Sequence, residues 1–374
     1  MLESLAGTVL FFSSSWCLMK FSKTVAFLSL VGLFFMGCAS DRSVTKFSES
    51  RMDQEDSPRG YELSERVRVL EETVSSLRSE VGDLRSGAGG LRARPPITAF
   101  RLPEEADLCG ERIPLEDRRI WEELDREFLV TLENEAQILL WMKRARRYFP
   151  YIEKRLKELG LPDDLKYVTI TESSLRPYAV SSSGASGIWQ FIPSTGEKYG
   201  MIRNRGVDER FDFFKATEGA LSYLQWLYQE FGSWTLAMAA YNAGENRVRK
   251  EVEFQNTNSY FRLDLPAETE RYVYKIAAAK IILSHPERYG LQLETRDFYD
   301  PLHPERIQIA LAQPLPLIEV ARAVGSYYKE IKEMNPHFSE ETIPAGVHFL
   351  NLPPGTSEAF WVFFSDWEKG LECK

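Results

Sequence analysis

The sequence has few of the residues that build metal centres. Its 374 residues include four cysteines and four histidines. The histidines are scattered, and no cysteine–histidine cluster has the spacing of a metal site. A glycine-rich phosphate-binding loop is also missing. We therefore predict that the protein uses no metal ion and no cofactor.

An excess of positive charge is missing as well. The chain contains 46 lysines and arginines against 55 aspartates and glutamates, so its net charge is −9. Proteins that bind nucleic acid need surplus cations to neutralise phosphates. Nucleic acid is therefore excluded as the main partner, although the charge identifies no substrate. The length and composition fit a soluble protein with two folded domains and tails.

The apolar segment near the amino terminus, Val25–Met36, is too short to span a membrane comfortably. It follows a basic stretch that starts at Met19, which is the layout of a signal peptide. We expect translation to begin at Met19, and we expect residues 1–38 to be a signal peptide that is not part of the folded protein. The alternative is a longer signal anchor that also uses residues 5–12.

Segment 33–40, Leu-Phe-Phe-Met-Gly-Cys-Ala-Ser, resembles the lipobox of bacterial lipoproteins, and its Gly37-Cys38 pair carries the likeness. The resemblance implies that Cys38 becomes the lipidated first residue. Its acyl chains would anchor it with about 0.8 kcal/mol per buried methylene. By the sorting rule of such lipoproteins, Ala39 implies an anchor at the periplasmic face of the outer membrane.

Residues 39–97 are expected to form a tether with a coiled coil at 61–86. Alternating steps of four and three residues separate its apolar positions, which are Leu63, Val67, Leu70, Val74, Leu77, Val81 and Leu84. In a parallel dimer, Arg66 would face Glu71 across the seam. The heptads therefore predict a homodimer. The alternative is a single amphipathic helix that lies on the globular domain.

Residues 98–298 carry mainly helical signals, so the expected fold class is mainly α. The expected helices are 115–148, 151–159, 161–175, 215–231, 234–243 and 269–284. Gly160 has the position of a C-cap, and Pro162 has that of a first helical turn. Ser194 and Glu197 have the spacing of a capping box.

Residues 299–374 are expected to form a small C-terminal domain. Its predicted elements are a strand at 306–312, helices at 317–325 and 328–335, and a strand at 348–352. This α+β unit resembles a LysM module, which is a glycan-binding fold, and the alternative is a structural cap on the helical domain. Cys109 and Cys373 flank the globular part, and they either form a disulfide or remain two separate thiols.

Within the predicted helix 161–175, Glu172 lies on an apolar stripe. Val168 and Leu175 share its face because they are four and three residues away. Burial makes a carboxylate costly to ionise and raises its pKa. A carboxyl that keeps its proton near neutral pH suits a general acid for glycoside cleavage. For a lone glutamate, the alternative is a solvated or arginine-paired residue at the edge of the stripe.

Two other segments have the chemistry of a cleft for a polar polymer. Residues 179–190 are rich in serine and glycine, which predicts a loop that allows close approach and places Gln190 beside large apolar side chains. Tyr241 and Asn242 stand near the end of a helix, just before Gly244. A tight structural turn is the alternative for the loop, and a core position is the alternative for Tyr241.

These segments together resemble the lytic transglycosylases related to soluble lytic transglycosylase. The matching motifs are Glu172-Ser173, Ala179-x-Ser181-x-x-Gly184-Ala185-x-Gly187-x-x-Gln190, Pro193-x-Thr195 and Ala240-Tyr241-Asn242-Ala243-Gly244. Because several separated motifs occur in the right order over about 115–290, the resemblance is specific. The segment Gly187-Ile188-Trp189-Gln190 resembles a membrane-bound branch of the family, because other members carry Leu-Met-Gln at this place.

The resemblance implies a lysozyme-like helical domain that cleaves peptidoglycan between N-acetylmuramic acid and N-acetylglucosamine and leaves a 1,6-anhydro end. Glu172 would be the single acid–base residue, and Ser181 would bind the N-acetyl group of the muramic sugar. The other expected substrate contacts are Gln190, Tyr241, Asn242 and Glu268. Glu268 belongs to the motif Glu268-Thr269-x-x-Tyr272-Val273, and its alternative role is to stabilise a helix start.

Two other functions remain open on the sequence. One is a lysozyme-type hydrolase on the same fold, with water as the nucleophile. The other is a non-catalytic lipoprotein that binds peptidoglycan at the outer membrane. Product masses distinguish the first from a transglycosylase, because anhydro ends lack the water that hydrolysis adds. The Glu172→Gln variant distinguishes the second.

Overall fold

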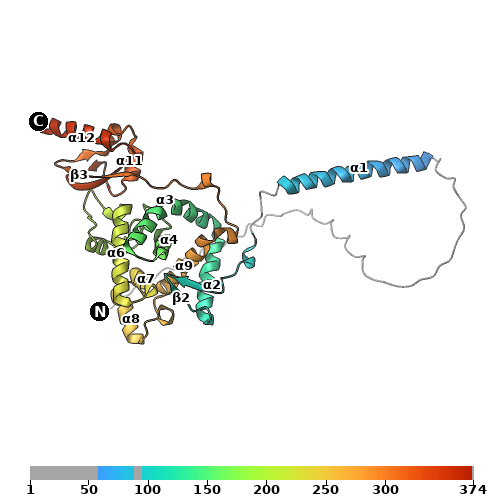
Figure 1. The fold of residues 1–374 in the computed structure, drawn as a ribbon, viewed down its shortest axis with the longest axis horizontal. Coiled ribbons are helices and arrows are strands. Elements are labelled where there is room, and N and C mark those ends of the chain that lie inside the picture. Colours follow the sequence, from blue (N-terminus) through green and yellow to red (C-terminus); the bar gives the residue numbers. More distant parts are fainter. Residues whose placement is uncertain (1–57, 88–94, 373–374) are drawn as a thin grey trace, which may run out of the picture. The chain divides into compact units, whose positions relative to one another are not determined.

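The computed structural model describes residues 58–87 and 95–372 (Figure 1). The chain divides into two compact units, residues 1–87 and 88–374, and each is described by itself. Cys38 and Cys373 lie outside the described residues, so lipidation and the disulfide stay predictions. Within the described ranges, no helix is long and apolar enough to cross a membrane.

The first unit contains one described helix, α1 (Pro58–Gly87), which agrees with the helix predicted at 61–86. Arg68 pairs on its surface with Glu65 at 2.6 Å and with Glu72 at 3.4 Å. The heptad positions described in this single chain are exposed, and they are Val67, Leu70, Val74 and Leu77. Pairing of two such helices into a coiled coil stays a prediction.

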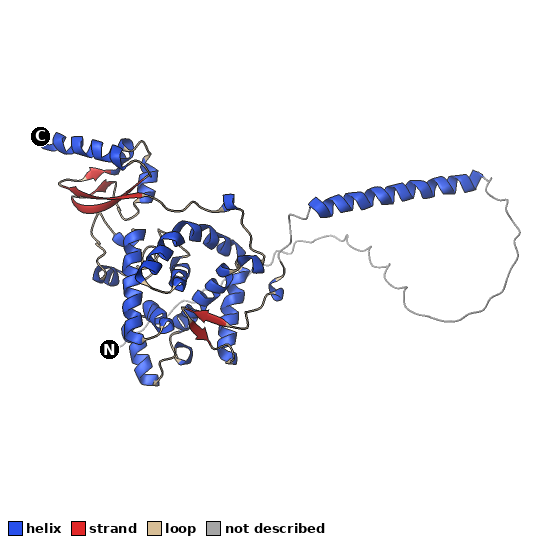
Figure 2. Cartoon of the chain, in the orientation of Figure 1, coloured by secondary structure: helices blue, strands red, loops and turns tan. Residues whose placement is uncertain are grey.

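The second unit is mainly helical, as predicted (Figure 2). Within residues 95–298, the longer helices are α2 (Arg118–Glu133), α3 (Glu135–Leu159), α6 (Phe213–Phe231), α7 (Trp234–Ala243), α8 (Glu245–Gln255) and α9 (Ala267–Ser284). The shorter helices of this range are η2 (Ile97–Ala99), η3 (Asp163–Tyr167), α4 (Val168–Ser173), α5 (Pro193–Lys198), η4 (Glu209–Phe211), η5 (Tyr260–Arg262), η6 (Pro286–Tyr289) and η7 (Thr295–Asp297). Helix α8 was not predicted, because Gly244 ends α7 and also begins α8.

The helix boundaries follow from local capping. The side chain of Asp117 accepts from the amide of Arg119 at the start of α2, and Gly160 ends α3 in a left-handed conformation, as predicted. The predicted capping box at Ser194 is wrong. Helix α5 begins at Pro193 with no side-chain cap, because proline needs no partner for a missing amide hydrogen at the first helical position.

Helices α7 and α9 form the centre of the helical subdomain, residues 95–298. Helix α9 packs against α2, α4 and α7, and α7 also packs against α6. Residues 234–240 of α7 are all buried, as expected for a helix that is apolar on every side. A short hairpin of β1 (Ala106–Leu108) and β2 (Glu111–Ile113) was missed, because three-residue strands are too short to show alternation.

The C-terminal subdomain, residues 299–372, has the predicted strand–helix–helix–strand order. Strands β3 (Glu305–Leu311) and β6 (Gly346–Leu352) pair antiparallel, with Ile309 opposite His348. Between them lie β4 (Leu315–Pro316), α10 (Leu317–Ala323), α11 (Tyr328–Met334) and β5 (Thr342–Ile343). Helix α12 (Ser357–Glu372) was not predicted, and it contributes Phe360 and Phe364 to the core. The likeness to a LysM module stays a prediction.

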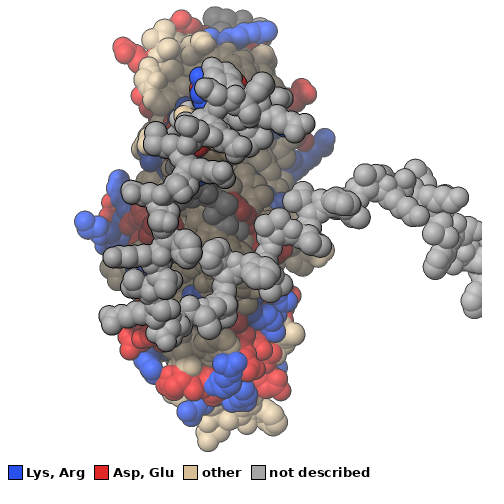
Figure 3. All heavy atoms as spheres, turned by 90° about the vertical axis from the view of Figure 1, so that its right-hand side faces the viewer, with Lys and Arg blue, Asp and Glu red and all other residues tan. Residues whose placement is uncertain are grey.

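Acidic and basic side chains are interspersed over the described parts that are visible in Figure 3. Many of them form short-range pairs, such as Arg112 with Glu116 at 2.8 Å and Arg118 with Glu122 at 2.9 Å. Exposed pairs of this kind contribute little to stability, so the fold depends mainly on its apolar cores.

Candidate active site

Glu172 lies in the last turn of α4, and the segment before it differs from the prediction. A 3-10 turn, η3, replaces the first part of the predicted helix, and α4 ends at Ser173. Ser174 and Leu175 then adopt left-handed φ angles of 56° and 58°. Val168 and Leu175 are fully buried as predicted, so Glu172 lies beside the core although the helix that carries it is short.

The carboxyl of Glu172 has a hydrogen-bond donor and an unusual environment. The hydroxyl of Tyr272, from α9, donates to Oε1 of Glu172. Burial raises the pKa of Glu172 to about 7, the hydrogen bond from Tyr272 opposes this, and the charge of Glu268 adds to it. A large share of the Glu172 carboxyl is therefore protonated at neutral pH, as a general acid requires.

Tyr241 and Tyr272 bring α7 and α9 to this carboxyl. Burial and the negative charge of Glu172 both raise the pKa of each tyrosine well above its usual value, so both hydroxyls stay neutral. The hydroxyl of Tyr241 donates to the backbone carbonyl of Trp189 at 2.7 Å. Tyr241 therefore connects the helix that carries it to the serine- and glycine-rich segment.

The serine–glycine loop, residues 179–191, is fastened to α4. The hydroxyl of Ser173 donates to the carbonyl of Ile188 at 2.8 Å. Within the loop, Ser181 Oγ accepts from the amide of Ala185 at 3.0 Å. Gln190 Nε2 donates to the carbonyls of Ala179 and Gly187 at 3.1 and 2.7 Å. The loop is therefore a closed, hydrogen-bonded structure directly after the helix of Glu172.

Asn242 and Glu268 complete the predicted set. Oδ1 of Asn242 accepts from the hydroxyl of Thr269 at 2.9 Å, which joins α7 to the first turn of α9. Glu268 is exposed in that same turn, and its charge acts on Glu172. The structure thus brings Glu172, Tyr241 and Glu268 near one another, while Asn242 and the loop border them.

Sequence reasoning missed two residues of this region. Tyr272 was part of a quoted motif without a role, and its hydrogen bond to Glu172 gives it one. Arg210 had no sequence signal, yet it is buried and donates to two carbonyls of the serine–glycine loop. Outside the grey segments of Figure 1, no group of three or more histidine, cysteine, aspartate or glutamate side chains is arranged to hold a metal ion.

One known family model matches part of the helical subdomain. Residues 150–262 match the family model of the transglycosylase SLT domain. The matched range contains Glu172, the serine–glycine loop and the Tyr241-Asn242 pair. This part of the chain is therefore similar to a transglycosylase SLT domain, and the resemblance predicted from the motifs is confirmed.

Two individual proteins are also similar to this chain in sequence. It is 35% identical over 216 residues to membrane-bound lytic murein transglycosylase D of Escherichia coli K12, a match that covers 56% of this chain and 47% of the relative. It is 33% identical over 127 residues to the soluble lytic murein transglycosylase of Salmonella typhimurium, covering 30% of this chain and 19% of that protein. The matched part thus spans about half the length of the first relative.

A solved structure of the same class is also similar. The 70 kDa soluble lytic transglycosylase of Escherichia coli matches with a TM-score of 0.31 and 22% sequence identity. The match covers 47% of this chain and 32% of that one.

Proposed function

We propose that this protein is a lytic transglycosylase of peptidoglycan, which cleaves the bond between N-acetylmuramic acid and N-acetylglucosamine and forms a 1,6-anhydro end. The observation that carries the proposal is the Glu172 carboxyl. It is held by Tyr272 beside the serine–glycine loop, with a pKa of about 7. The SLT domain and its named relatives support the same reaction.

Glu172 acts first as an acid. Its proton moves to the glycosidic oxygen as the bond from C1 of the muramic sugar breaks, so N-acetylglucosamine leaves with a free hydroxyl. Many glycosidases supply a second carboxylate at this stage. Here the neighbouring acetamido oxygen of the substrate stabilises the positive charge that develops at C1.

Glu172 then acts as a base. Its carboxylate takes the proton of the muramic 6-hydroxyl, whose oxygen attacks C1 and closes the anhydro ring. The residue ends protonated, as it began, and no water is consumed. Using a nucleophile within the same sugar lowers the entropic barrier. The low polarity that raises the pKa of Glu172 also makes its carboxylate a stronger base in this second step.

The bordering residues position the sugar. We assign Ser181 to the N-acetyl group of the muramic sugar, and Gln190, Tyr241 and Asn242 to the cleft beside the scissile bond. Glu268 would contact the substrate from the first turn of α9 and keep the pKa of Glu172 high. The C-terminal subdomain is a candidate glycan-binding module of the LysM kind.

The cellular setting follows from the segments before the SLT domain. We propose that Cys38 carries lipid, that this anchor places the protein at the periplasmic face of the outer membrane, and that residues 61–86 pair two copies. The name of the first relative, a membrane-bound enzyme, supports membrane association. The partners are then peptidoglycan strands, the outer membrane and a second copy of the chain.

The deciding experiment is digestion of purified peptidoglycan by the parent protein and by Glu172→Gln, with mass analysis of the soluble products. We expect anhydro ends from the parent and none from the variant. Products that are heavier by one water would identify a lysozyme-type hydrolase. Equal release by both proteins would reject the assignment of Glu172 as the acid. Release by neither protein would favour a non-catalytic role.

A further inference from the structure

A hairpin of the helical subdomain enters the core of the C-terminal subdomain. Residues 203–208 turn back on themselves between α5 and α6, with a β-bridge between Arg203 and Asp208. Val207 at its tip is fully buried and packs within the apolar cluster of the C-terminal subdomain. It pairs with Phe338 through a second bridge, and the amide of Asp208 donates to the carbonyl of His337 at 2.8 Å.

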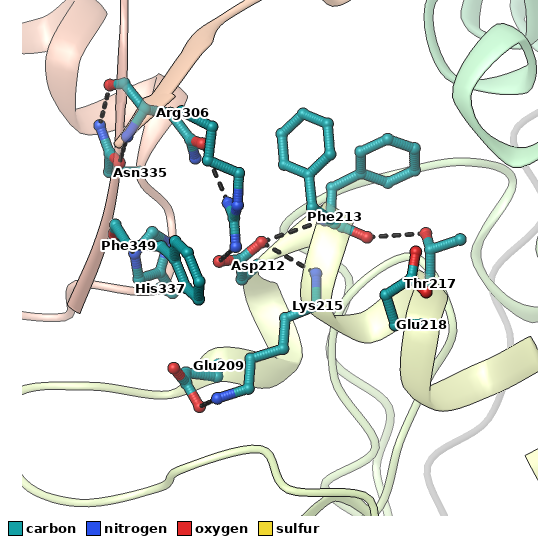
Figure 4. Close-up of polar contacts among 12 residues, drawn as sticks. Glu209, Asp212, Phe213, Lys215, Thr217, Glu218, Arg306, Asn335, His337 and Phe349 are labelled. Atoms are coloured by element: carbon teal, nitrogen blue, oxygen red, sulfur yellow. Dashed lines mark hydrogen bonds and ion pairs between the residues drawn. The ribbon is translucent and has the colours of Figure 1, made fainter. Parts of the chain in front are cut away.

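A buried ion pair fastens the same segment from its other end (Figure 4). Asp212, which caps α6 through its Oδ1, accepts from Arg306 of β3 at 2.8 Å through its Oδ2. The guanidinium of Arg306 lies 4.9 Å from the ring centre of Phe214 and 4.4 Å from that of Phe349. Arg306 is therefore held between an aromatic ring of each subdomain, so residues 203–212 are fixed by the C-terminal subdomain at both ends.

Arg210 lies between these two attachment points and faces the active site. Its side chain is buried and forms a salt bridge with Asp208 at 2.6 Å. The remaining nitrogen, Nη1, donates to the carbonyls of Gly184 and Phe191 at 2.8 and 2.9 Å. One guanidinium thus joins the middle of the serine–glycine loop to its end, with planar geometry that lysine cannot reproduce.

The backbone of Arg210 is just as close to the loop. Gly187 has a φ of 81°, and a Cβ at this position would overlap the carbonyl oxygen of Arg210. The serine–glycine loop and the segment that follows the hairpin are therefore packed backbone to backbone. Any displacement of residues 208–212 would move the loop that carries Ser181 and Gln190 and that is fastened to Ser173, next to Glu172.

We propose that Arg210 is a positioning residue for the serine–glycine loop, and that the C-terminal subdomain supports cleavage by holding residues 203–212, the segment that carries Arg210. This inference rests on the proposed transglycosylase function. It gives the C-terminal subdomain a role in the chemical step, separate from any capture of glycan. Loss of the contacts between the C-terminal subdomain and Val207 or Asp212 would make the serine–glycine loop less ordered. It would also lower the rate at which bound substrate reacts.

Three variants of the full chain test this. Arg210→Lys keeps a charge beside Asp208 but loses the two carbonyl contacts, and Arg306→Met removes the ion pair to Asp212. Arg205→Met is the matched control, because Arg205 belongs to the same hairpin and pairs with Glu340 at 3.2 Å, but is exposed. If Arg306→Met does not fold, Arg306→Gln replaces it, since glutamine removes the charge of the ion pair but keeps a polar side chain.

The readouts separate positioning from glycan capture. On short soluble glycan strands, we expect Arg210→Lys to lower kcat about tenfold or more with little change in KM, Arg306→Met to lower kcat several-fold, and Arg205→Met to stay within about twofold. Sedimentation of the variants with insoluble peptidoglycan should match the parent. An unchanged kcat for Arg210→Lys or for the Arg306 variant that folds overturns the proposal, as does an effect on KM or sedimentation alone.

Hydrogen exchange gives a test that needs no activity. Amides of residues 179–191 should exchange faster in Arg210→Lys and in the Arg306 variant, while α7 and α9 keep the parent's rates. Equal protection of the loop in all variants overturns the inference. If the parent releases no anhydro products, the proposed function fails by itself, and the exchange result still decides whether Arg210 and the C-terminal subdomain order the loop.

Discussion

At the scale of single residues, the active site trades stability for chemistry. A carboxyl whose pKa is raised on folding costs free energy at every pH above its unfolded pKa. Glu172 is such a group, because burial raises its pKa to about 7 from an ordinary value of 4.5. The free energy that this ionisation costs the folded state is therefore small below pH 4.5. It grows between pH 4.5 and about 7, and it reaches its full size above that pH.

The Glu172→Gln variant should accordingly be more stable than the parent in weak alkali. The amide is never charged, so the variant escapes the ionisation cost while filling nearly the same space. We expect its Tm to exceed that of the parent by about 2–4 °C near pH 8 and by less near pH 4. Calorimetry at the two pH values checks this, and a difference that does not depend on pH would contradict it.

The neighbours of Glu172 should shift its titration in opposite directions. The hydrogen bond from Tyr272 lowers the pKa of Glu172, and the charge of Glu268 raises it. Because the acid form starts the reaction, kcat/KM should fall as the pH rises past this pKa. Tyr272→Phe should move that fall to higher pH, and Glu268→Gln should move it to lower pH. Rate profiles that shift in the same direction would refute this picture of the site.

A pair of glycines allows strain and steric overlap to be separated. Gly184 and Gly187 share a φ of 81°, but a Cβ at Gly184 would meet open space while one at Gly187 would overlap Arg210. Gly184→Ala should therefore cost about 1–2 kcal/mol from its backbone conformation alone. Gly187→Ala should cost clearly more and abolish most activity. Urea unfolding of both variants checks this, and equal losses would show that the overlap is relieved.

At the scale of elements, the periodic spacing of apolar residues predicted the helices. Contacts between residues that are distant in the chain could not be predicted. The helices near 215–231, 234–243 and 269–284 follow from apolar spacing, and the structure has them within two residues at each end. The apolar stripe also located Glu172 at the edge of the core. The left-handed pair after α4 could not be predicted, because neither Ser174 nor Leu175 is a residue that favours that conformation.

The limits of sequence reasoning in the site have the same cause. Tyr272 and Arg210 act through partners that are distant in the chain, so no local spacing reveals which carbonyl or carboxyl they reach. Gln190 was expected to face a substrate, whereas the structure adds that its amide nitrogen is bound to two carbonyls of its own loop. The sequence could therefore name candidate residues, but it could not predict the contacts that they make in the structure.

Helix α1 allows a direct test of pairing. Leu70 and Leu77 are two of its exposed heptad positions. Replacing both by lysine should convert a dimer into a monomer in analytical ultracentrifugation, because a paired seam cannot bury two charges. Lysines at Ser75 and Ser76, which lie between the heptad positions, should leave the dimer intact. A monomeric parent would contradict the pairing.

At the scale of the second unit, the contact between its subdomains should weaken in acid. Burial opposes ionisation of Asp212, yet His337 and Arg306 lower its pKa below the usual 3.8, while burial lowers the pKa of His337 below 6.5. Both groups then favour the folded state at neutral pH. The stability that they contribute is lost as the pH falls, first through protonation of His337 on unfolding and then through protonation of Asp212.

The Asp212→Asn variant should therefore have a flatter dependence of Tm on pH. Asparagine still caps α6, but it has no charge to lose and leaves Arg306 without its ion pair. We expect the variant to be less stable than the parent near pH 7 and the two to converge in strong acid, where Asp212 is protonated in the folded state as well. Scanning calorimetry across this range provides the measurement, and parallel curves would contradict the prediction.

The valine at the hairpin tip has a consequence for how the chain matures. Synthesis proceeds from the amino end, so Val207 emerges long before the strands that will enclose it. Until those strands arrive, the nascent helical subdomain displays a bare apolar side chain and an uncompensated aspartate at one spot. A chain that ends between the two subdomains would keep this apolar and charged spot exposed.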